Sequence, residues 1–135
     1  TGLLKNKAAS NVDVRIILPE VPDKAFAYAV TRNNAEKLIG CGVKIYCMKH
    51  SFVHSKLILT ENCAVIGSIN MDLRSFFQQF ECAVYTDDAG VMQDIEKDFE
   101  DTFGKSETID EDNGRRSKLR NRALAGVLQI FAPLM

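Results

Sequence analysis

The amino-acid sequence predicts an α/β domain with a mixed, mainly β, sheet of about five strands flanked by helices. Three observations lead to this fold class. The 135 residues are 46% hydrophobic and 26% charged, which suits one globular domain with a buried core. Short β-branched runs alternate with helical periodicity in the first half, and two apolar runs around a short polar turn indicate a β-hairpin.

The first half of the chain favours a β-α-β unit. Residues 1–10 resemble the end of a helix, and because the chain begins there without a methionine, we expect a fragment of a longer protein. Residues 12–18 are apolar and β-branched, as in a buried strand. Helical spacing follows over 22–40, and residues 43–46 give a second strand. This order predicts a crossover between neighbouring strands of a parallel or mixed sheet.

The second half of the chain predicts the hairpin and a long helix. Residues 52–59 and 64–68 are the two apolar strands, joined by a turn at 60–62. Three elements follow: a short helical turn within 70–80, a strand over 81–86 and a helix over 87–103. The long helix places four apolar side chains on one face at four-residue spacing: Val91, Ile95, Phe99 and Phe103.

The end of the chain differs in composition from the rest. We expect residues 1–104 to form the main domain, 105–116 a polar linker and 117–135 an amphipathic helix with a basic beginning. Its apolar stretch, 123–135, is too short to span a bilayer. Two interpretations stay open: this helix docks on a part of the protein outside the chain, or it lies on an anionic membrane surface.

Composition also narrows the partners and cofactors. The formal net charge of -1 argues against a nucleic-acid partner, because phosphate binding needs a basic face. The four cysteines form no C-x-x-C pair, which indicates reduced thiols in an intracellular chain. Cys47, His50 and His54 lack a fourth ligand at a zinc spacing, so we expect neither a metal nor another cofactor.

The stretch HSKLILTENCAVIGSIN, residues 54–70, carries the candidate chemistry. In a strand, His54 and Lys56 point to the same face, and Ser68 and Asn70 are related in the same way. A hairpin turn midway between the two pairs brings them together. A histidine can attack phosphorus or transfer a proton, while the other three side chains can stabilise phosphate oxygens without a metal. The set therefore indicates phosphoryl transfer.

These residues resemble the signature of the phospholipase D superfamily, in which His-x-Lys, an aspartate and Gly-Ser-x-Asn follow one another. The matching positions are His54, Lys56, Glu61, Gly67, Ser68 and Asn70. Glu61 replaces the family aspartate, whose role is mainly structural, and five residues separate it from Gly67 where the signature has six. The resemblance therefore implies a phospholipase D-like half-domain with intact chemistry and a changed turn.

Six segments narrow the resemblance to the C-terminal half of the bacterial cardiolipin synthases of the phospholipase D type. They are VDVRIILPEVPDK, LIGCGVKIY, HSKLIL, GSINMDLRSF, FECAVY and FAPLM. Residues 1–104 would then be an N-terminally truncated catalytic half-domain. The implied reaction is phosphatidyl transfer between two phosphatidylglycerol molecules through a phosphohistidine, with release of glycerol.

The resemblance also implies roles for single residues. The implied catalytic residues are His54, Lys56, Asn70 and Glu81, the implied phosphate-binding residues are Lys56, Ser68 and Asn70, and the implied structural residues are Glu61 and Gly67. Glu81 stands where the family has the acid that orients the histidine, which would fix the tautomer and stabilise the imidazolium. For Arg74, a contact with a lipid phosphate and a simple salt bridge both stay open.

Enzymes of this family combine two such motifs, whereas this chain contains one. Either an N-terminal half with membrane segments supplies the second, or two copies pair. The resemblance favours the first and makes His54 the general acid/base, with a nucleophilic role still open. It implies anionic phospholipid substrates, and it places the complete enzyme in the bacterial cell membrane with its catalytic part on the cytoplasmic side. The fragment itself would be soluble and inactive alone.

Two other functions stay open at this point. One is a phospholipase D-type phosphodiesterase or nuclease that works as a homodimer, and the other is a folding unit without activity. Each site residue also has an ordinary structural interpretation. His54 could be a half-buried strand residue, and Glu81 could be a surface carboxylate. Ser68 and Asn70 could be turn residues at a strand end.

Overall fold

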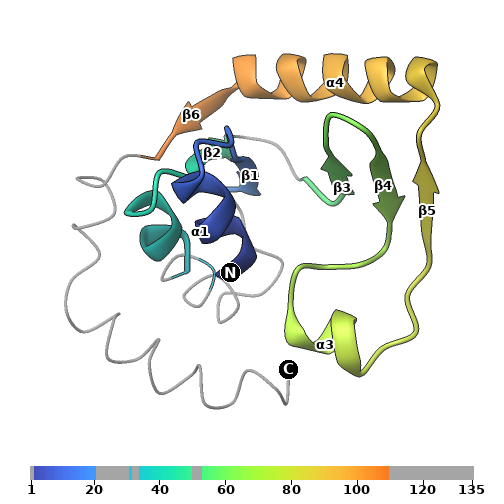
Figure 1. Cartoon of the computed structure of the whole chain (residues 1–135), viewed down its shortest axis with the longest axis horizontal. Helices are drawn as coiled ribbons and strands as arrows, with labels where there is room; N and C mark the ends of the chain where they lie inside the picture. Colours follow the sequence, from blue (N-terminus) through green and yellow to red (C-terminus); the bar gives the residue numbers. More distant parts are fainter. Residues whose placement is uncertain (1, 21–30, 32–33, 50–52, 110–135) are drawn as a thin grey trace.

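A computed structural model gives the structure of residues 2–20, 31, 34–49 and 53–109. Its elements are, in chain order, α1 (Gly2–Ala9), β1 (Arg15–Pro19), β2 (Lys44–Met48), β3 (Lys56–Leu59), β4 (Ala64–Gly67), α3 (Leu73–Phe77), β5 (Ala83–Thr86), α4 (Ala89–Gly104) and β6 (Ser106–Thr108). Residues 34–39 are also helical. The strands form two three-stranded sheets, and α4 contacts both of them (Figure 1). The α/β class is therefore confirmed.

The first sheet has the strand order β1-β2-β6. β1 and β2 run parallel, with Arg15 opposite Lys44 and Pro19 opposite Met48. This pairing confirms the predicted crossover, because parallel neighbours need such a connection. Of the helix predicted over 22–40, residues 34–39 are helical, and 22–30, 32 and 33 lie outside the described residues. α1 confirms the helix expected near the start of the chain. It is followed by Asn11, whose φ of 62° is a left-handed conformation that asparagine tolerates.

The core forms where the first sheet meets α1 and the helical residues 34–39. Ala35 and Leu38 pack there with Val43 and Ile45. Ile45 is 1% exposed, the largest fully buried side chain in the described part of the molecule. Seven partly buried apolar side chains surround this cluster: Leu4, Ala8, Val14, Ile16, Leu18, Ile39 and Ile109. Removal of this apolar surface from water is the main force that stabilises the first sheet.

The second sheet is antiparallel and has the order β3-β4-β5. Lys56 lies opposite Gly67 and Leu59 lies opposite Ala64, so the hairpin turns between Leu59 and Ala64 as predicted. β5 continues the sheet on the other side of β4, with Ala83 opposite Gly67. This register decides which side chains meet at the candidate site.

α4 runs along both sheets (Figure 1), and aromatic side chains on one of its faces pack against the first sheet. The Asp88 side chain caps its first turn. Of the predicted apolar face, Ile95 is buried and the Phe99 and Phe103 rings lie 6.0 Å apart. The Phe103 ring also packs 4.6 Å from the ring of Tyr46 in β2. These contacts fix the long helix on the first sheet.

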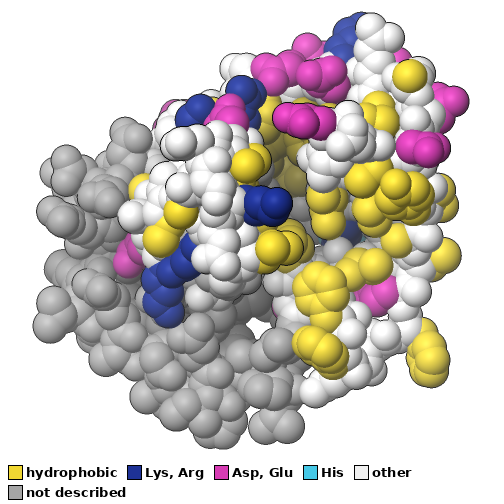
Figure 2. All heavy atoms as spheres, in the orientation of Figure 1, with side chains coloured by type: hydrophobic (Ala, Val, Ile, Leu, Met, Phe, Trp, Pro, Cys, Tyr) yellow, Lys and Arg dark blue, Asp and Glu magenta, His cyan; other side chains and the backbone are white. Residues whose placement is uncertain are grey.

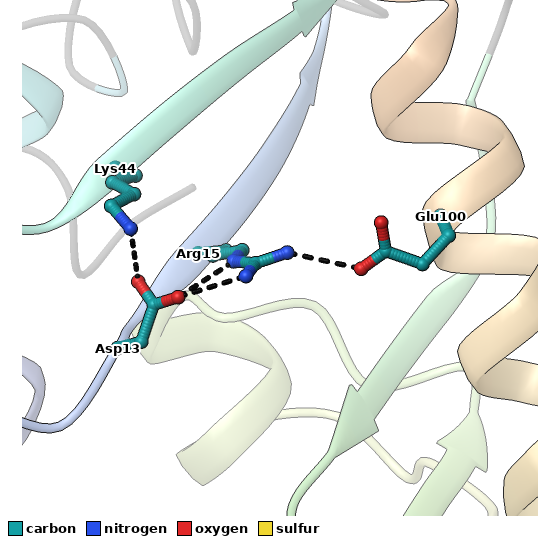
Figure 3. A network of polar contacts seen from close by, with 4 residues as sticks. All are labelled: Asp13, Arg15, Lys44 and Glu100. Atoms are coloured by element: carbon teal, nitrogen blue, oxygen red, sulfur yellow. Dashed lines mark hydrogen bonds and ion pairs between the residues drawn. The ribbon is translucent and has the colours of Figure 1, made fainter.

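A network of ion pairs also joins α4 to the first sheet (Figure 3). Arg15 contacts Asp13 at 2.9 Å and Glu100 of α4 at 3.0 Å, and Lys44 contacts Asp13 at 2.8 Å. The hydrogen bond from Lys44, followed by that from Arg15, holds the pKa of Asp13 below its ordinary value. All four side chains are more than one-third exposed, so water screens the network and its contribution to stability is small.

The arrangement of the strands differs from the prediction in two ways. The sequence predicts one sheet, but β1 and β6 occupy both edges of β2, which leaves no edge there for the hairpin. Ser106–Thr108, expected in the polar linker, form β6, and the amide of Ile109 then donates to the carbonyl of Ile45 at 2.8 Å. Residues 110–135, with the rest of the expected linker and the amphipathic helix, lie outside the described residues. The predicted domain division therefore stays a prediction.

Candidate functional site

The candidate site lies at the end of the β3–β4 hairpin that is remote from its turn. Lys56 begins β3, Gly67 ends β4, and the two residues face each other in the ladder. His54 precedes this end of the hairpin, and Ser68 follows it. The register thus brings the His-x-Lys and Gly-Ser segments to one end of the hairpin, as the sequence predicts.

His54 and Lys56 contact each other directly. The Lys56 ammonium lies 2.9 Å from His54 Nδ1 and also donates to the His54 carbonyl at 2.6 Å. A lysine ammonium can only donate, so Nδ1 accepts in this contact, and the ring proton is assigned to Nε2. His54 is exposed and Lys56 is half-buried. The arrangement sets a fixed cation beside an imidazole that solvent can reach.

Gly67 allows β5 to approach β4 closely. A Cβ at this position would lie 2.4 Å from the carbonyl oxygen of Cys82 and 2.7 Å from Cα of Ala83. Both neighbouring atoms belong to the backbone and cannot swing away, so a side chain would push the strands apart. The amide of Ser68 donates to the same Cys82 carbonyl at 2.9 Å. The glycine of the motif is therefore required by strand packing.

The Ser68 hydroxyl links the end of β4 to Glu81. It donates to Glu81 Oε2, and it accepts from the amide of Cys82 at 3.1 Å. A hydrogen bond to a carboxylate is charge-assisted and stronger than a neutral one. Glu81 is half-buried. The structure thus joins Ser68, which is predicted to bind the phosphate, to Glu81, which is predicted to orient His54. Both roles stay predictions.

Gln79 contacts the other oxygen of the same carboxylate. When its amide nitrogen faces Glu81, that nitrogen lies 3.2 Å from Glu81 Oε1, and the amide oxygen lies 3.1 Å from Arg74 Nε. In this orientation the amide nitrogen faces an acceptor and the amide oxygen faces a donor. The sequence prediction does not include Gln79. The available signal is its position two residues before Glu81, close enough along the chain for the two side chains to meet.

Asn70 lies in the turn between β4 and α3, with its side chain exposed. Its carbonyl accepts from the amide of Asp72 at 2.9 Å. The Asp72 side chain in turn caps α3 by accepting from the amide of Ser75 at 2.7 Å. The contacts described above join His54 to Lys56 and Ser68 to Glu81, and the convergence of Asn70 with them stays a prediction.

Glu61 lies in the turn at the opposite end of the hairpin and is exposed. The turn is held by Thr60, whose hydroxyl oxygen accepts from the amides of Asn62 at 3.3 Å and Cys63 at 3.1 Å. A serine or threonine that bonds nearby amides is a common stabiliser of tight turns. Thr60 provides the bonds that hold the turn. The replacement of the signature aspartate by Glu61 therefore changes only a side chain on the surface of the turn.

In the described part of the chain, no group of three or more Cys, His, Asp or Glu side chains could hold a metal ion. His50, a member of the zinc alternative, lies outside the described residues. What the described site offers is an imidazole, an ammonium and a carboxylate held by neutral donors. Such a set can move a proton and stabilise charge on phosphate oxygens.

Large apolar side chains are exposed next to the site. Phe76 and Phe77 belong to α3 and Phe80 follows it, and Phe77 is 80% exposed. Val84 and Tyr85 of β5 are also exposed. Figure 2 shows apolar side chains gathered over the second sheet and α3. A gathering of this kind is typical of a surface that contacts another protein or a membrane.

Comparison with known proteins identifies relatives of the chain. A family model described as "Cardiolipin synthase, PLD-like domain" matches residues 2–103. Over 98% of its length the chain is 32% identical to Cardiolipin synthase 2 of Bacillus cereus and 33% identical to Cardiolipin synthase of Geobacillus kaustophilus. It is 35% identical, again over 98%, to a protein of Streptococcus mutans serotype c whose name assigns no function.

The chain covers only part of these relatives. It spans 26% of the length of both cardiolipin synthases and 29% of the Streptococcus mutans protein. No solved structure matches it. Of the helices in the described residues, none has the length and apolar character needed to cross a membrane.

Proposed function

Because the chain belongs to the family of cardiolipin synthase phospholipase D-like domains, we propose that it is the C-terminal catalytic half of a cardiolipin synthase. The enzyme would be a phosphatidyltransferase that joins two phosphatidylglycerol molecules. The observation that carries this proposal is the contact between His54 and Lys56 at the end of the hairpin where Ser68 holds Glu81. A titratable imidazole beside a fixed cation suits phosphoryl transfer.

The reaction consists of two displacements at phosphorus. In the first, a histidine nitrogen attacks the phosphorus of phosphatidylglycerol, the bond to the glycerol headgroup breaks, and a general acid protonates the departing oxygen. In the second, a hydroxyl of another phosphatidylglycerol attacks the phosphohistidine. The phosphorus–nitrogen bond breaks, and the hydroxyl proton returns to the general base. Two phosphatidylglycerol molecules thus give one cardiolipin and one glycerol.

His54 is the general acid/base in this scheme. As the general acid, His54 acts in its imidazolium form, and Nε2, which carries the ring proton while Nδ1 accepts from Lys56, is the atom that gives its proton to the leaving oxygen. Glu81 stabilises the imidazolium that forms when His54 takes a proton. Lys56 and Asn70 hold the non-bridging phosphate oxygens, and Ser68 supports the site through its bond to Glu81.

The nucleophilic histidine comes from a second motif in a part of the enzyme N-terminal to this chain. Two observations support that assignment: the chain holds one His-x-Lys motif, and it spans about a quarter of its curated relatives. The exposed aromatic side chains of α3 offer that part a surface to cover. The complete enzyme acts at the bacterial cell membrane with this half on the cytoplasmic side, where anionic phospholipids are its substrates.

The proposal is tested with the complete enzyme on vesicles of phosphatidylglycerol. We expect cardiolipin and glycerol in equal amounts, and no product from vesicles of zwitterionic phosphatidylcholine. Phosphatidic acid without cardiolipin would make the protein a phospholipase. Cleavage of DNA without lipid turnover would make it a nuclease, and either result would contradict the proposal.

A further inference from the structure

We propose that Gln79 is a positioning residue whose side-chain amide, oriented by Arg74, holds the Glu81 carboxylate in place for its task at His54. The inference rests on the proposed function, because it gives Gln79 a part in the acid–base step. Neither the sequence prediction nor the family resemblance assigns any role to this residue.

Two different segments hold the Glu81 carboxylate, one at each oxygen. Oε2 accepts from the Ser68 hydroxyl at the end of β4. Oε1 lies 3.2 Å from the amide nitrogen of Gln79, which follows α3. With one bond, the carboxylate could still rotate about its terminal single bond, which is a soft torsion. Bonds to both oxygens fix the plane of the group.

Arg74 determines which end of the Gln79 amide faces Glu81. Arg74 Nε lies 3.1 Å from the amide oxygen, and a guanidinium can only donate, so the amide nitrogen is turned toward Glu81. The backbone supports this arrangement, because the amide of Gln79 donates to the carbonyl of Arg74 at 3.0 Å. Donor and acceptor therefore alternate along the whole series from Arg74 through Gln79 and Glu81 to Ser68.

A neutral amide is the appropriate group for this task. A carboxylate stabilises a developing imidazolium best when its position is fixed before the charge forms. A lysine or arginine in place of Gln79 would also hold Glu81, but its positive charge would offset the negative charge that His54 needs. Gln79 holds the carboxylate and leaves its charge available.

The test compares three variants in the complete enzyme. Gln79→Leu removes the donor, and we expect kcat to fall about tenfold at nearly constant KM, the scale of one hydrogen bond to a charged group. Gln79→Glu keeps the length of the side chain and places a second carboxylate beside Glu81. Because adjacent carboxylates share a proton, the acidic limb of the pH–rate profile should move to higher pH. Gln93→Leu, on the exposed side of α4, is the matched control and should behave as wild type.

Three outcomes separate the possibilities. A loss of kcat in Gln79→Leu together with the shifted limb in Gln79→Glu supports the inference. A wild-type kcat and a wild-type pH profile in both variants would overturn it. So would a loss of activity that is matched by a lower melting temperature, if the pH profile of Gln79→Glu stays unchanged. His54→Ala is measured alongside. Near-normal cardiolipin synthesis by that variant would contradict the proposed function itself, independently of the results for Gln79.

Discussion

The two sheets of the molecule differ in how their strands are held. The first sheet covers a core of its own, in which Ile45 is 1% exposed. The second sheet exposes apolar side chains of β5, including Val84 and Tyr85, and depends more on backbone pairing and on polar contacts at its end. The candidate site belongs to the second sheet. We therefore expect the largest losses of stability from substitutions in the first sheet and the largest losses of activity from substitutions at the end of the second sheet.

The largest effect on stability is expected in the core of the first sheet. Ile45→Ala should lower the free energy of unfolding by about 3 kcal/mol, because it leaves a cavity around a fully buried site. Ile58→Ala, in β3 where Ile58 is 45% exposed, is the matched substitution and should cost less than about 1 kcal/mol. Urea unfolding of both variants measures the difference. Equal losses would contradict the contrast between the sheets.

The next largest effect on stability is expected at Gly67, where β4 and β5 of the second sheet approach each other closely beside the site. Gly67→Ala should cost about 2 kcal/mol, because the new Cβ would overlap the backbone at Cys82 and Ala83. Cardiolipin formation should fall more than stability, because β5 leads back to Glu81. Gly104→Ala is the control, since a Cβ there meets no atom within 4 Å. Comparable activity in the two variants would show that close strand packing is not needed at the site.

A smaller effect is expected from the two helix caps. Asp72 caps α3 beside the site, and Asp88 caps α4. Loss of either cap by substitution with alanine should cost about 1 kcal/mol. Asp72→Ala should also slow cardiolipin formation, whereas Asp88→Ala should leave it unchanged. Thermal melting and a lipid assay on each variant check both expectations. A loss of activity in Asp88→Ala alone would contradict the placement of the site beside α3.

The smallest effect is expected from the ion pairs of the first sheet. The pKa of Asp13 is lowered from 3.8, chiefly by the hydrogen bond from Lys44, so the stabilisation is present above that pH and is lost as pH falls through the folded-state pKa. Asp13→Asn should remove this dependence and cost less than about 1 kcal/mol at neutral pH. Unfolding measured from pH 6 down to about pH 3 checks the sign. A variant that gains stability relative to wild type as pH rises would contradict it.

Much of the fold could be predicted because its signals are local. Apolar runs, helical spacing and turn residues lie within a few positions of one another, and they predict the parallel pair, the hairpin and α4. β6 could not be predicted in this way. Its polar residues carry no hydropathy pattern, and they pair with β2 across sixty or so positions of sequence.

The residues of the candidate site could be named from the sequence, and their roles stay predictions, whereas the contacts among them could not be foreseen. The register of the hairpin follows from its turn, so the closeness of His54 and Lys56 to the Gly-Ser segment could be predicted. The bond between Ser68 and Glu81 joins residues thirteen positions apart and depends on how far β5 can approach Gly67. Gln79 can contact Glu81 because α3 ends at Phe77, and local sequence patterns do not specify that end.

The central claim is that His54 takes part in the chemistry, and its most direct test uses the two histidines of the chain. His54→Ala and His50→Ala are each introduced into the complete enzyme, and the initial rate of cardiolipin formation from phosphatidylglycerol is measured. We expect His54→Ala to lower the rate about a thousandfold, the scale of a lost general acid/base, and His50→Ala to retain the wild-type rate. Near-normal synthesis by His54→Ala would contradict the claim.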